Sequence, residues 1–267
     1  MTYAGAYTVA MRRIAIVRGV PDSFADALVM GESPTIDVGR AREQHSVYVQ
    51  FLADNGYELR MLEADEDHPD CPFVEDVVVV LDSVAALTRP GAESRRGEVA
   101  AMAAELDGVR RLRKITEPGT LDGGDVLRLG DTIYVGDSAR TNREGIRQLT
   151  EIAGEDGLRV IAVPVSGVLH LKSAVARLDD DTVLLAPDCV DPDFFADYRI
   201  VEKVSAEAHL ASVLSLDGGG LAMTTTAPLT LQRLQAAGYD PALVDSSEFQ
   251  AADGGLTCLS VLVDRVE

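Results

Sequence analysis

The chain contains no tryptophan and few other aromatic residues, so aliphatic side chains must fill its core. Only three cysteines occur among its 267 residues, and Cys71, Cys189 and Cys258 are too widely separated to form a CxxC pair. Their number and spacing exclude a disulfide framework and a paired-cysteine metal site. They predict a cytoplasmic protein in a reducing compartment.

Basic residues are also scarce, because 24 Lys and Arg stand against 44 Asp and Glu and give a formal net charge of −20. This balance argues against a nucleic-acid partner, since polyanions are bound through Lys and Arg that release counterions. It suits a cationic ligand. No apolar run reaches membrane-spanning length, and residues 1–13 lack the apolar core of a signal peptide. We therefore expect neither a membrane nor a nucleic acid among the partners.

The chain does contain a repeat. Helical spacing of apolar residues is followed five times by a strand-like segment, and pairs of short apolar strands separate these units. The helix-like segments are 40–56, 95–106, 141–152, 193–198 and 229–237, and the strands after them are 57–62, 109–115, 158–163, 199–204 and 239–244. The other expected strands are 13–17, 77–81, 85–88, 126–129, 132–135, 175–178, 182–185, 213–216, 221–225 and 259–263.

Five units of roughly fifty residues each predict a ring of five β-β-α-β repeats. No Pro- or Ser-rich linker divides them, so we expect one domain over residues 1–267. Closure of the ring would place the terminal strand beside the first strand, around Ile14. The alternative is a doubly wound parallel sheet, which requires longer helices and fewer strand pairs.

Cys258 follows Gly254 and Gly255 and precedes an apolar segment, residues 259–263, that is typical of a strand. Paired glycines permit a sharp turn or a close approach to a ligand. A thiol at the mouth of a strand is placed as a nucleophile would be. A free cysteine is also commonly a small buried apolar residue. This segment alone leaves both interpretations open.

His170 follows the turn formed by residues 164–167, and we expect it to open a strand. A histidine in an otherwise apolar run costs free energy unless it has a partner, so it is either catalytic or a core histidine with a hydrogen bond. Of the other histidines, we expect His45 in a helix and His68 in an acidic loop, both solvated. His209 lies in an ordinary stretch before a strand.

Acidic residues stand directly before two predicted strands. The sequence Asp122-Gly123-Gly124-Asp125 is either a simple turn or a loop whose glycines let a carboxylate reach inward and orient a histidine. Glu75 and Asp76 lead into residues 77–81, which are apolar throughout and are therefore expected to be buried. Carboxylates at the mouth of a buried strand are explained better by a cationic ligand than by solubility.

Two arginine-bearing segments, residues 88–96 and 138–143, each lead from a strand into a helix N-terminus. Such a position suits the binding of a carboxylate. Together with the thiol, the histidine and the inward acids, they predict a pocket for a molecule with a cationic head and an amino-acid tail.

At these residues the chain resembles the dimethylarginine dimethylaminohydrolases, a family of guanidino-modifying enzymes. The likeness extends over nearly the whole chain. It is carried by residues 15–18, 37–45, 69–76, 88–92, 120–127, 140–142, 169–173 and 257–258. The resemblance implies an α/β fold, the five-bladed propeller called the pentein fold, which agrees with the repeat count.

The resemblance implies a cysteine hydrolase without metal or organic cofactor, in which N-methylated arginine is cleaved to citrulline and the amine through a covalent Cys-amidino intermediate. It is compatible with a homodimer, and zinc could occupy the thiol site only as an inhibitor. The implied catalytic residues are the nucleophile Cys258, the general acid/base His170, and Asp122, which orients His170. The implied substrate-binding groups are Glu75, Asp76 and the Ala252 carbonyl for the guanidinium, Asp70 and the Val20 carbonyl for the α-amino group, and Arg95 and Arg140 for the α-carboxylate.

Other activities remain open at this point. Arginine deimination, citrulline hydrolysis and amidino transfer share the same chemistry, but a deiminase-like chain would usually carry an inserted helical region that is absent here. A non-catalytic arginine-binding protein of the same fold is a further alternative. The presence of Cys258, His170 and Asp122 together argues against it.

Overall fold

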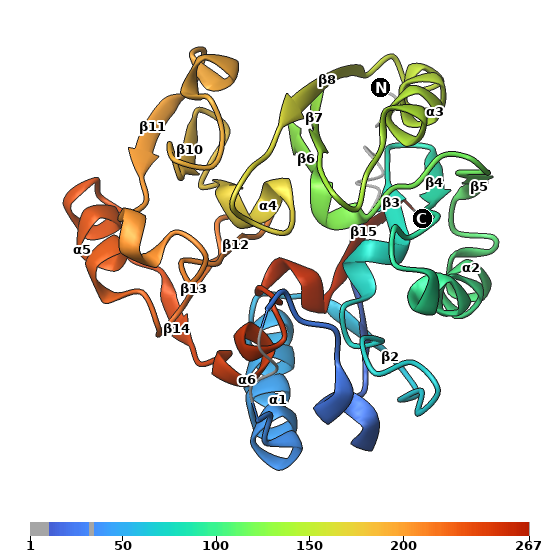
Figure 1. Ribbon diagram of the computed structural model, residues 1–267, viewed down its shortest axis with the longest axis horizontal. Coiled ribbons are helices and arrows are strands. Elements are labelled where there is room, and N and C mark those ends of the chain that lie inside the picture. Colours follow the sequence, from blue (N-terminus) through green and yellow to red (C-terminus); the bar gives the residue numbers. More distant parts are fainter. Residues whose placement is uncertain (1–10, 32–34, 267) are drawn as a thin grey trace, which may run out of the picture.

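The computed structural model describes residues 11–31 and 35–266, in which the strands form five three-stranded sheets arranged as a ring (Figure 1). The ring confirms the predicted five-bladed α/β propeller. The expected domain limits, 1–267, include residues 1–10 and 267, which lie outside the described part. Among the described residues, no helix combines the length and apolarity that crossing a membrane requires.

The strands are β1 (Met11–Arg18), β2 (Glu58–Leu62), β3 (Val78–Val80), β4 (Val84–Leu87), β5 (Arg111–Lys114), β6 (Val126–Leu129), β7 (Thr132–Asp137), β8 (Arg159–Pro164), β9 (Val175–Arg177), β10 (Thr182–Leu185), β11 (Arg199–Glu202), β12 (Val213–Ser215), β13 (Leu221–Thr224), β14 (Ala242–Val244) and β15 (Val261–Val266). The α-helices are α1 (Val38–Asp54), α2 (Val99–Leu106), α3 (Arg143–Gly154), α4 (Leu171–Ala174), α5 (Pro228–Ala236) and α6 (Ser247–Ala251). The short 3₁₀ helices are η1 (Asp22–Asp26), η2 (Val74–Val77), η3 (Glu93–Glu98), η4 (Gly123–Asp125), η5 (Pro192–Phe195), η6 (Ser205–Glu207) and η7 (Thr257–Leu259).

Each sheet has the same internal order. A middle strand pairs antiparallel with the strand before it and parallel with the strand after it, and the parallel connection carries a helix. In four blades this helix is α1, α2, α3 or α5, all on the outside of the ring (Figure 1). The fourth blade has only the 3₁₀ helix η5 there, which Pro192 begins. A parallel pair needs a crossover of this kind, and this explains the repeating β-β-α-β order.

The two ends of the described chain close the ring. Strand β15 pairs antiparallel with β1, and Ile14 lies opposite Val263. The first blade therefore takes its inner strand from the end of the sequence. The expected contact between the terminal segment and the first strand is confirmed. It places the strand that follows Cys258 beside β1.

Local capping fixes the ends of the longer helices. The Asp37 side chain accepts a hydrogen bond from the Arg40 backbone N–H at the start of α1. Asn142 caps α3 in the same way, by accepting from the Gly145 N–H. Gly56 follows α1 with φ of 83°, a left-handed conformation that glycine adopts without strain.

The expectation that His45 is solvated is wrong. Helix α1 turns His45 toward the core, where its ring lies 6.1 Å from the Phe249 ring and its Nε2 has no hydrogen-bond partner among the described residues. Burial lowers the pKa of His45 to about 4, so the imidazole is neutral near pH 7. The expected solvation of His68 holds only in part, because its Nδ1 pairs with Asp65 at 2.9 Å.

A buried hydrogen bond ties α1 to Ser260, the residue before the inner strand β15 of its own blade. The Tyr48 hydroxyl lies 2.7 Å from Ser260 Oγ, and both residues are buried. Ser260 is two residues beyond Cys258, so this bond holds the segment that follows the predicted nucleophile. It links the first long helix to the end of the chain.

We predict that Tyr48→Phe lowers the free energy of unfolding by about 1–3 kcal/mol, because it leaves the buried Ser260 hydroxyl without its partner. Urea titration measures the change. The double variant Tyr48→Phe/Ser260→Ala should lose less than the sum of the two single losses. Ser46→Ala, which removes an exposed hydroxyl from the same helix, is the control. Equal losses in Tyr48→Phe and Ser46→Ala would contradict the assignment.

Candidate active site

Seven of the ten residues implied as site residues line one small cavity of about 20 Å³. They are Asp70, Asp76, Arg95, Arg140, His170, Ala252 and Cys258. Asp122 joins this group through His170, as described below. We call this the first cavity.

The site residues share a place in the blades. Asp76 lies in η2, Asp122 directly precedes η4, His170 directly precedes α4, and Cys258 lies in η7. Each of these one-turn segments leads into the inner strand of a blade, namely β3, β6, β9 or β15. A repeated architecture thus brings residues from far apart in the sequence to one end of the ring.

Cys258 differs in detail from its expected surroundings. The strand begins at Val261 rather than at residue 259, so Cys258 belongs to the turn η7. The Gly255 backbone N–H lies 3.3 Å from its Sγ. A Cβ at Gly254 would lie 2.2 Å from the Phe73 ring, and one at Gly255 would lie 2.6 Å from Ser212 Oγ. The paired glycines therefore serve the close approach of this turn to neighbouring blades.

His170 does not open a strand, contrary to expectation. It precedes the single turn α4, and β9 begins only at Val175. The turn forms because the Asp125 carboxylate accepts from the Leu171 N–H at 2.9 Å and the His170 carbonyl accepts from the Ser173 N–H at 3.1 Å. A helix start supplies unpaired N–H groups, and Asp125 satisfies one of them.

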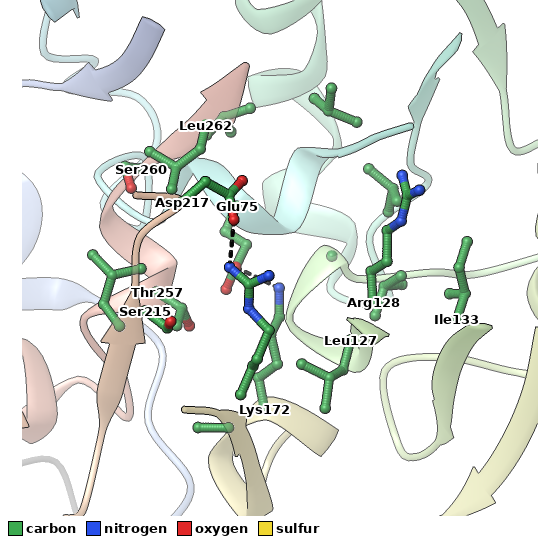
Figure 2. Close-up of a pocket in the computed structure, with 18 of the residues that line it drawn as sticks. Glu75, Leu127, Arg128, Ile133, Lys172, Ser215, Asp217, Thr257, Ser260 and Leu262 are labelled. Carbon is green, nitrogen blue, oxygen red and sulfur yellow. Dashed lines mark hydrogen bonds and ion pairs between the residues drawn. The ribbon is translucent and has the colours of Figure 1, made fainter. Parts of the chain in front are cut away.

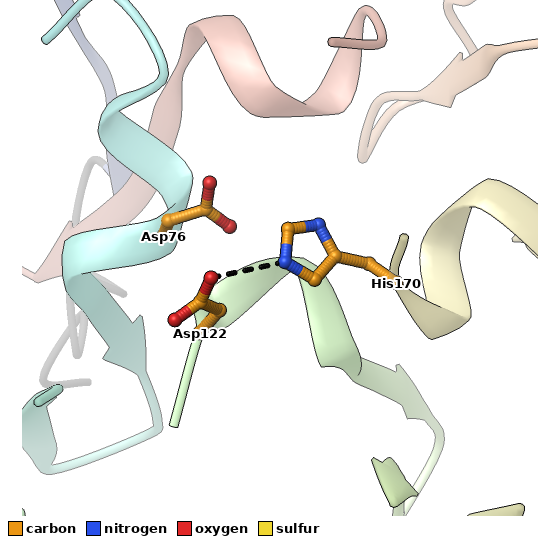
Figure 3. Close-up of side chains that lie close together, drawn as sticks. All are labelled: Asp76, Asp122 and His170. Atoms are coloured by element: carbon orange, nitrogen blue, oxygen red, sulfur yellow. Dashed lines mark hydrogen bonds and ion pairs between the residues drawn. The ribbon is translucent and has the colours of Figure 1, made fainter. Parts of the chain in front are cut away.

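The imidazole of His170 is buried among carboxylates (Figure 3). Its Nε2 lies 3.0 Å from Asp122 Oδ2. The other Asp122 oxygen accepts from the Gly91 N–H at 2.8 Å. Asp122 is fully buried, and both its oxygens have a partner. This fixed carboxylate can hold the ring of His170 in one orientation.

The glycines of the Asp-Gly-Gly-Asp motif are required by packing. A Cβ at Gly123 would lie 1.9 Å from the Glu75 carbonyl oxygen. One at Gly124 would lie 2.6 Å from His170 Nδ1 and 2.8 Å from Asp76 Oδ1. The Gly124 N–H also donates to Asp76 Oδ1 at 2.9 Å. This motif is therefore more than a turn, because it joins the Asp76 segment to His170.

Most N–H groups of Arg95 donate to other groups of the protein. Its Nη1 donates to Asp76 Oδ2 at 2.5 Å, and its Nε and Nη2 donate to the buried Glu98 carboxylate. Nη2 also donates to the Phe73 carbonyl at 2.9 Å. Of the five N–H groups of Arg95, one on Nη1 is left for a ligand. The guanidinium of Arg140, by contrast, makes no hydrogen bond or ion pair within the described part of the chain.

Two implied residues lie apart from the first cavity. The Val20 carbonyl already accepts a hydrogen bond from Arg42 Nε at 3.0 Å. Glu75 pairs with Lys172 and lines a much larger cavity of about 560 Å³ (Figure 2). We call this the axial cavity. The roles implied for Val20 and Glu75 thus find no direct support in the geometry of the first cavity.

The charged groups of the site determine the protonation states of His170 and Asp76. Burial by itself lowers the pKa of His170, but the nearby carboxylates Asp76, Asp122 and Asp125 outweigh it and raise that pKa to about 9. Burial raises the pKa of Asp76, but the charges of His170 and Arg95 prevail and lower it to about 2. At neutral pH His170 is therefore an imidazolium beside an ionised Asp76.

The thiol of Cys258 is protonated under the same conditions. Burial and the charges of Glu75 and Asp76 raise its pKa to about 12. A thiol is a weak nucleophile until it loses its proton. A cation bound among these carboxylates would offset their charge and lower the thiol pKa. The site is thus arranged to be activated by a cationic ligand.

Ligand atoms of Asp76, Asp122 and His170 all lie within 4.8 Å of one another, a spacing that could surround a metal ion. Each of these side chains is already engaged, because Asp76 binds Arg95 and the Gly124 N–H and Asp122 binds His170. The raised pKa of His170 shows that this cluster favours a proton on the imidazole. The donor set therefore suits proton transfer.

Comparison with known proteins agrees with this geometry. The family model for arginine deiminase matches residues 103–217. An N(G),N(G)-dimethylarginine dimethylaminohydrolase from Streptomyces coelicolor is 46% identical over 253 residues, which cover 92% of this chain and 95% of the relative. One from Pseudomonas aeruginosa is 35% identical over 248 residues, covering 92% and 97%. The chain belongs to the dimethylarginine dimethylaminohydrolase family.

Solved structures extend the comparison. A dimethylarginine dimethylaminohydrolase from Pseudomonas aeruginosa, a cysteine-to-serine mutant complexed with citrulline, superposes with a TM-score of 0.89 at 34% identity. It covers 95% of this chain and all of the other. The N-terminal domain of the arginine dihydrolase ArgZ shares the fold, with a TM-score of 0.83 at 17% identity. The family and fold that the sequence motifs indicated are both confirmed.

Sequence reasoning assigned no role to Asp125, although it lies in a motif that was singled out. Its second oxygen accepts from the Ser138 hydroxyl at 2.6 Å, so Asp125 joins α4 to the third blade. The sequence motifs did not single out Lys203 either, which is buried near the end of a predicted strand. The same predicted strand also contains Arg199 and Glu202, so the local sequence carries no clear signal that Lys203 is buried.

We predict that Gly124→Ala lowers the free energy of unfolding by about 1–3 kcal/mol, because its methyl group would overlap the His170 ring and the Asp76 carboxylate. Urea titration measures the loss. The matched control is Gly154→Ala, where a Cβ meets nothing within 4 Å. If the two variants are equally stable, the close packing of the motif against His170 is refuted.

We also predict that the rate at which iodoacetamide alkylates Cys258 rises roughly tenfold for each pH unit between pH 6 and 9, without a plateau. Only the thiolate reacts, and the pKa of the thiol lies well above this pH range. Peptide mapping by mass spectrometry follows the reaction at this residue. Cys71, which is deeply buried, should react more slowly throughout. A plateau near neutral pH would show that the thiolate forms without a ligand.

Proposed function

We propose that this protein hydrolyses N-methylated arginine, either asymmetric dimethylarginine or monomethylarginine, to citrulline and the corresponding amine. One observation carries the proposal. The Cys258 thiol, the His170 ring held by Asp122 and the Asp76 carboxylate meet at the first cavity. Two relatives that align with almost the whole chain are named as dimethylarginine dimethylaminohydrolases, which supports the same activity here.

The charges of the first cavity suit the two ends of such a substrate. Asp76 faces the guanidinium, and Arg95 acts mainly by holding Asp76 in place. Arg140, whose guanidinium is not engaged, binds the α-carboxylate. Asp70 binds the α-amino group, whereas Val20 does not line the first cavity and its carbonyl accepts from Arg42 Nε. The Ala252 carbonyl lies at the same cavity and can accept from a guanidinium N–H.

The first half of the reaction forms a covalent bond. The bound cation offsets the charges of Asp76 and Glu75, and the Cys258 thiol releases its proton to solvent, because His170 is already protonated. The Sγ thiolate attacks the guanidinium carbon, and the carbon–nitrogen bond to the methylated amine breaks. The His170 imidazolium gives its proton to the departing nitrogen. The product of this half is an amidino-thioether on Cys258.

The second half releases citrulline. His170 removes a proton from a water molecule whose oxygen attacks the amidino carbon. The Sγ–carbon bond then breaks, and its electron pair returns to sulfur. The ureido carbonyl of citrulline forms as the remaining proton passes from the oxygen to the Cys258 thiolate, which restores the thiol. Asp122 keeps the imidazole aligned for both transfers.

We further propose that residues 1–267 act as one catalytic domain on a small molecule, without nucleic acid. The closed ring and the net charge of −20 support this. A cytoplasmic location would keep the nucleophile reduced, as catalysis through a free thiol requires. A homodimer would carry two such sites, since the site residues named above all belong to a single chain.

We predict that purified protein converts dimethylated and monomethylated arginine to citrulline and amine, whereas arginine is a poor substrate. A niche for methyl groups distinguishes one methyl from two by only about 1–3 kcal/mol, so both methylated forms should react. Mass analysis of the products measures each rate. Cys258→Ala should lower kcat by roughly 10³-fold or more because the nucleophile is lost.

Cys71→Ala is the matched control, because it removes a buried cysteine outside the site. It should retain most of the activity. Equal loss in both cysteine variants would reject Cys258 as the nucleophile. Faster turnover of arginine than of dimethylarginine would instead place the protein among the deiminases, with the covalent mechanism kept.

A further inference from the structure

A second small cavity touches the catalytic pair from another side. It has a volume of about 30 Å³ and shares His170, Cys258, Asp253 and Gly254 with the first cavity. A cavity needs about 10–15 Å³ to hold one water molecule. This second cavity therefore offers room for water beside the reacting atoms while a substrate fills the first one.

Polar side chains supply part of the lining of the second cavity. Lys203 is 2% exposed, and its Nζ donates to the Ser173 carbonyl at 2.7 Å and to the Ala208 carbonyl at 3.3 Å. No carboxylate within the described residues forms an ion pair with it. Burial lowers the pKa of Lys203 to about 7. In its ammonium form Lys203 has three N–H groups, so one donor is then left for a ligand in the cavity.

Ser212 adds a second polar group to this lining. Its Oγ accepts from the Leu256 N–H at 2.8 Å, which leaves the hydroxyl hydrogen for another partner. Ser212 directly precedes β12, the inner strand of the fifth blade. The corresponding segments of the other four blades carry Asp76, Asp122, His170 and Cys258. The fifth blade thus contributes to the second cavity at the matching place.

A supply of solvent lies next to the second cavity. Lys172 and Thr257 line both it and the axial cavity (Figure 2). The axial cavity is bordered by Asp82 and Asp180, whose side chains are exposed. The second cavity therefore borders the axial cavity at Lys172 and Thr257, where Lys172 pairs with Glu75.

We propose that the second cavity holds the water molecule that hydrolyses the Cys258 intermediate, and that Lys203 is a positioning residue for it. This inference rests on the proposed function. Lys203 donates its remaining N–H to the water oxygen, and His170 accepts a proton from the water. The oxygen bonds to the amidino carbon, the Sγ–carbon bond breaks, and citrulline is released. The donors of Lys203 and Ser212 would lack partners beside an N-methyl group, so this part of the cavity suits water better.

The test separates the two halves of the reaction in Lys203→Met, which keeps an unbranched side chain one atom shorter and removes its donors. Rapid-quench mass spectrometry measures the fraction of enzyme that carries the amidino adduct on Cys258. We expect kcat to fall by roughly 10- to 100-fold, because the water is no longer held in place. The adduct should accumulate on most of the enzyme, and its rate of formation should change by less than about threefold.

Lys114→Met is the matched control, because Lys114 is exposed on β5. It should change neither kcat nor the adduct level. Lys203→Gln, which retains an N–H donor, should recover part of the hydrolysis rate. If Lys203→Met does not fold, Ser212→Ala provides the same test and must also accumulate the adduct.

Several results would overturn the inference. A lower kcat without adduct accumulation would show that Lys203 affects the first half or the fold alone. A changed preference between mono- and dimethylated arginine, with no adduct, would assign the cavity to the methyl groups. The proposed function fails separately, if the unmodified protein neither forms an adduct nor releases citrulline from methylated arginine.

Discussion

Gly123 approaches the Glu75 carbonyl so closely that a Cβ would lie 1.9 Å away, and Gly124 approaches His170 and Asp76 almost as closely. This packing of one loop against another sets the positions of the catalytic groups. It places the Asp122 carboxylate against His170, and it lets a backbone N–H bind Asp76. A side chain at either glycine would separate these groups, because backbone and buried imidazole cannot move aside cheaply.

The same packing brings several negative charges together inside the protein, and the cations His170 and Arg95 offset them in part. Three buried carboxylates, Asp76, Asp122 and Asp125, surround the imidazole and raise its pKa to about 9. Arg95 pairs with Asp76 and with Glu98, and this buried network would be costly if any member lost its partner. The protonated His170 and Arg95 still leave the thiol of Cys258 facing negative charge. A cationic substrate therefore completes the electrostatic balance of the site.

The repeated blades explain how distant segments meet. In four blades a one-turn segment precedes the inner strand, and these segments carry or adjoin the proposed nucleophile, base, orienting carboxylate and guanidinium partner. The fifth supplies Ser212 beside Lys203. In the proposed mechanism, the residues for binding and for the two chemical steps thus come from different blades of the ring. Pairing of β15 with β1 completes the arrangement, because it fixes the Cys258 turn next to the first blade.

The sequence alone determined the repeat, the ring and the family. Apolar periodicity and turn residues are local, and they recur often enough to show five units of the same order. It also indicated that a thiol, a histidine and inward acids would meet, since all of them precede buried strands. The family motifs then gave the individual residues, seven of which line the first cavity.

Only the tertiary structure decided how each of these side chains is used. Arg95 resembled a free carboxylate clamp, yet its N–H groups are mostly taken by Asp76, Glu98 and a backbone carbonyl. Glu75 stood beside Asp76 in sequence, but the turn η2 directs it to Lys172 and the axial cavity. His45 and Lys203 are buried although their neighbours in sequence gave little sign of it. Hydrogen-bond partners and burial come from segments far along the chain, and local sequence does not encode them.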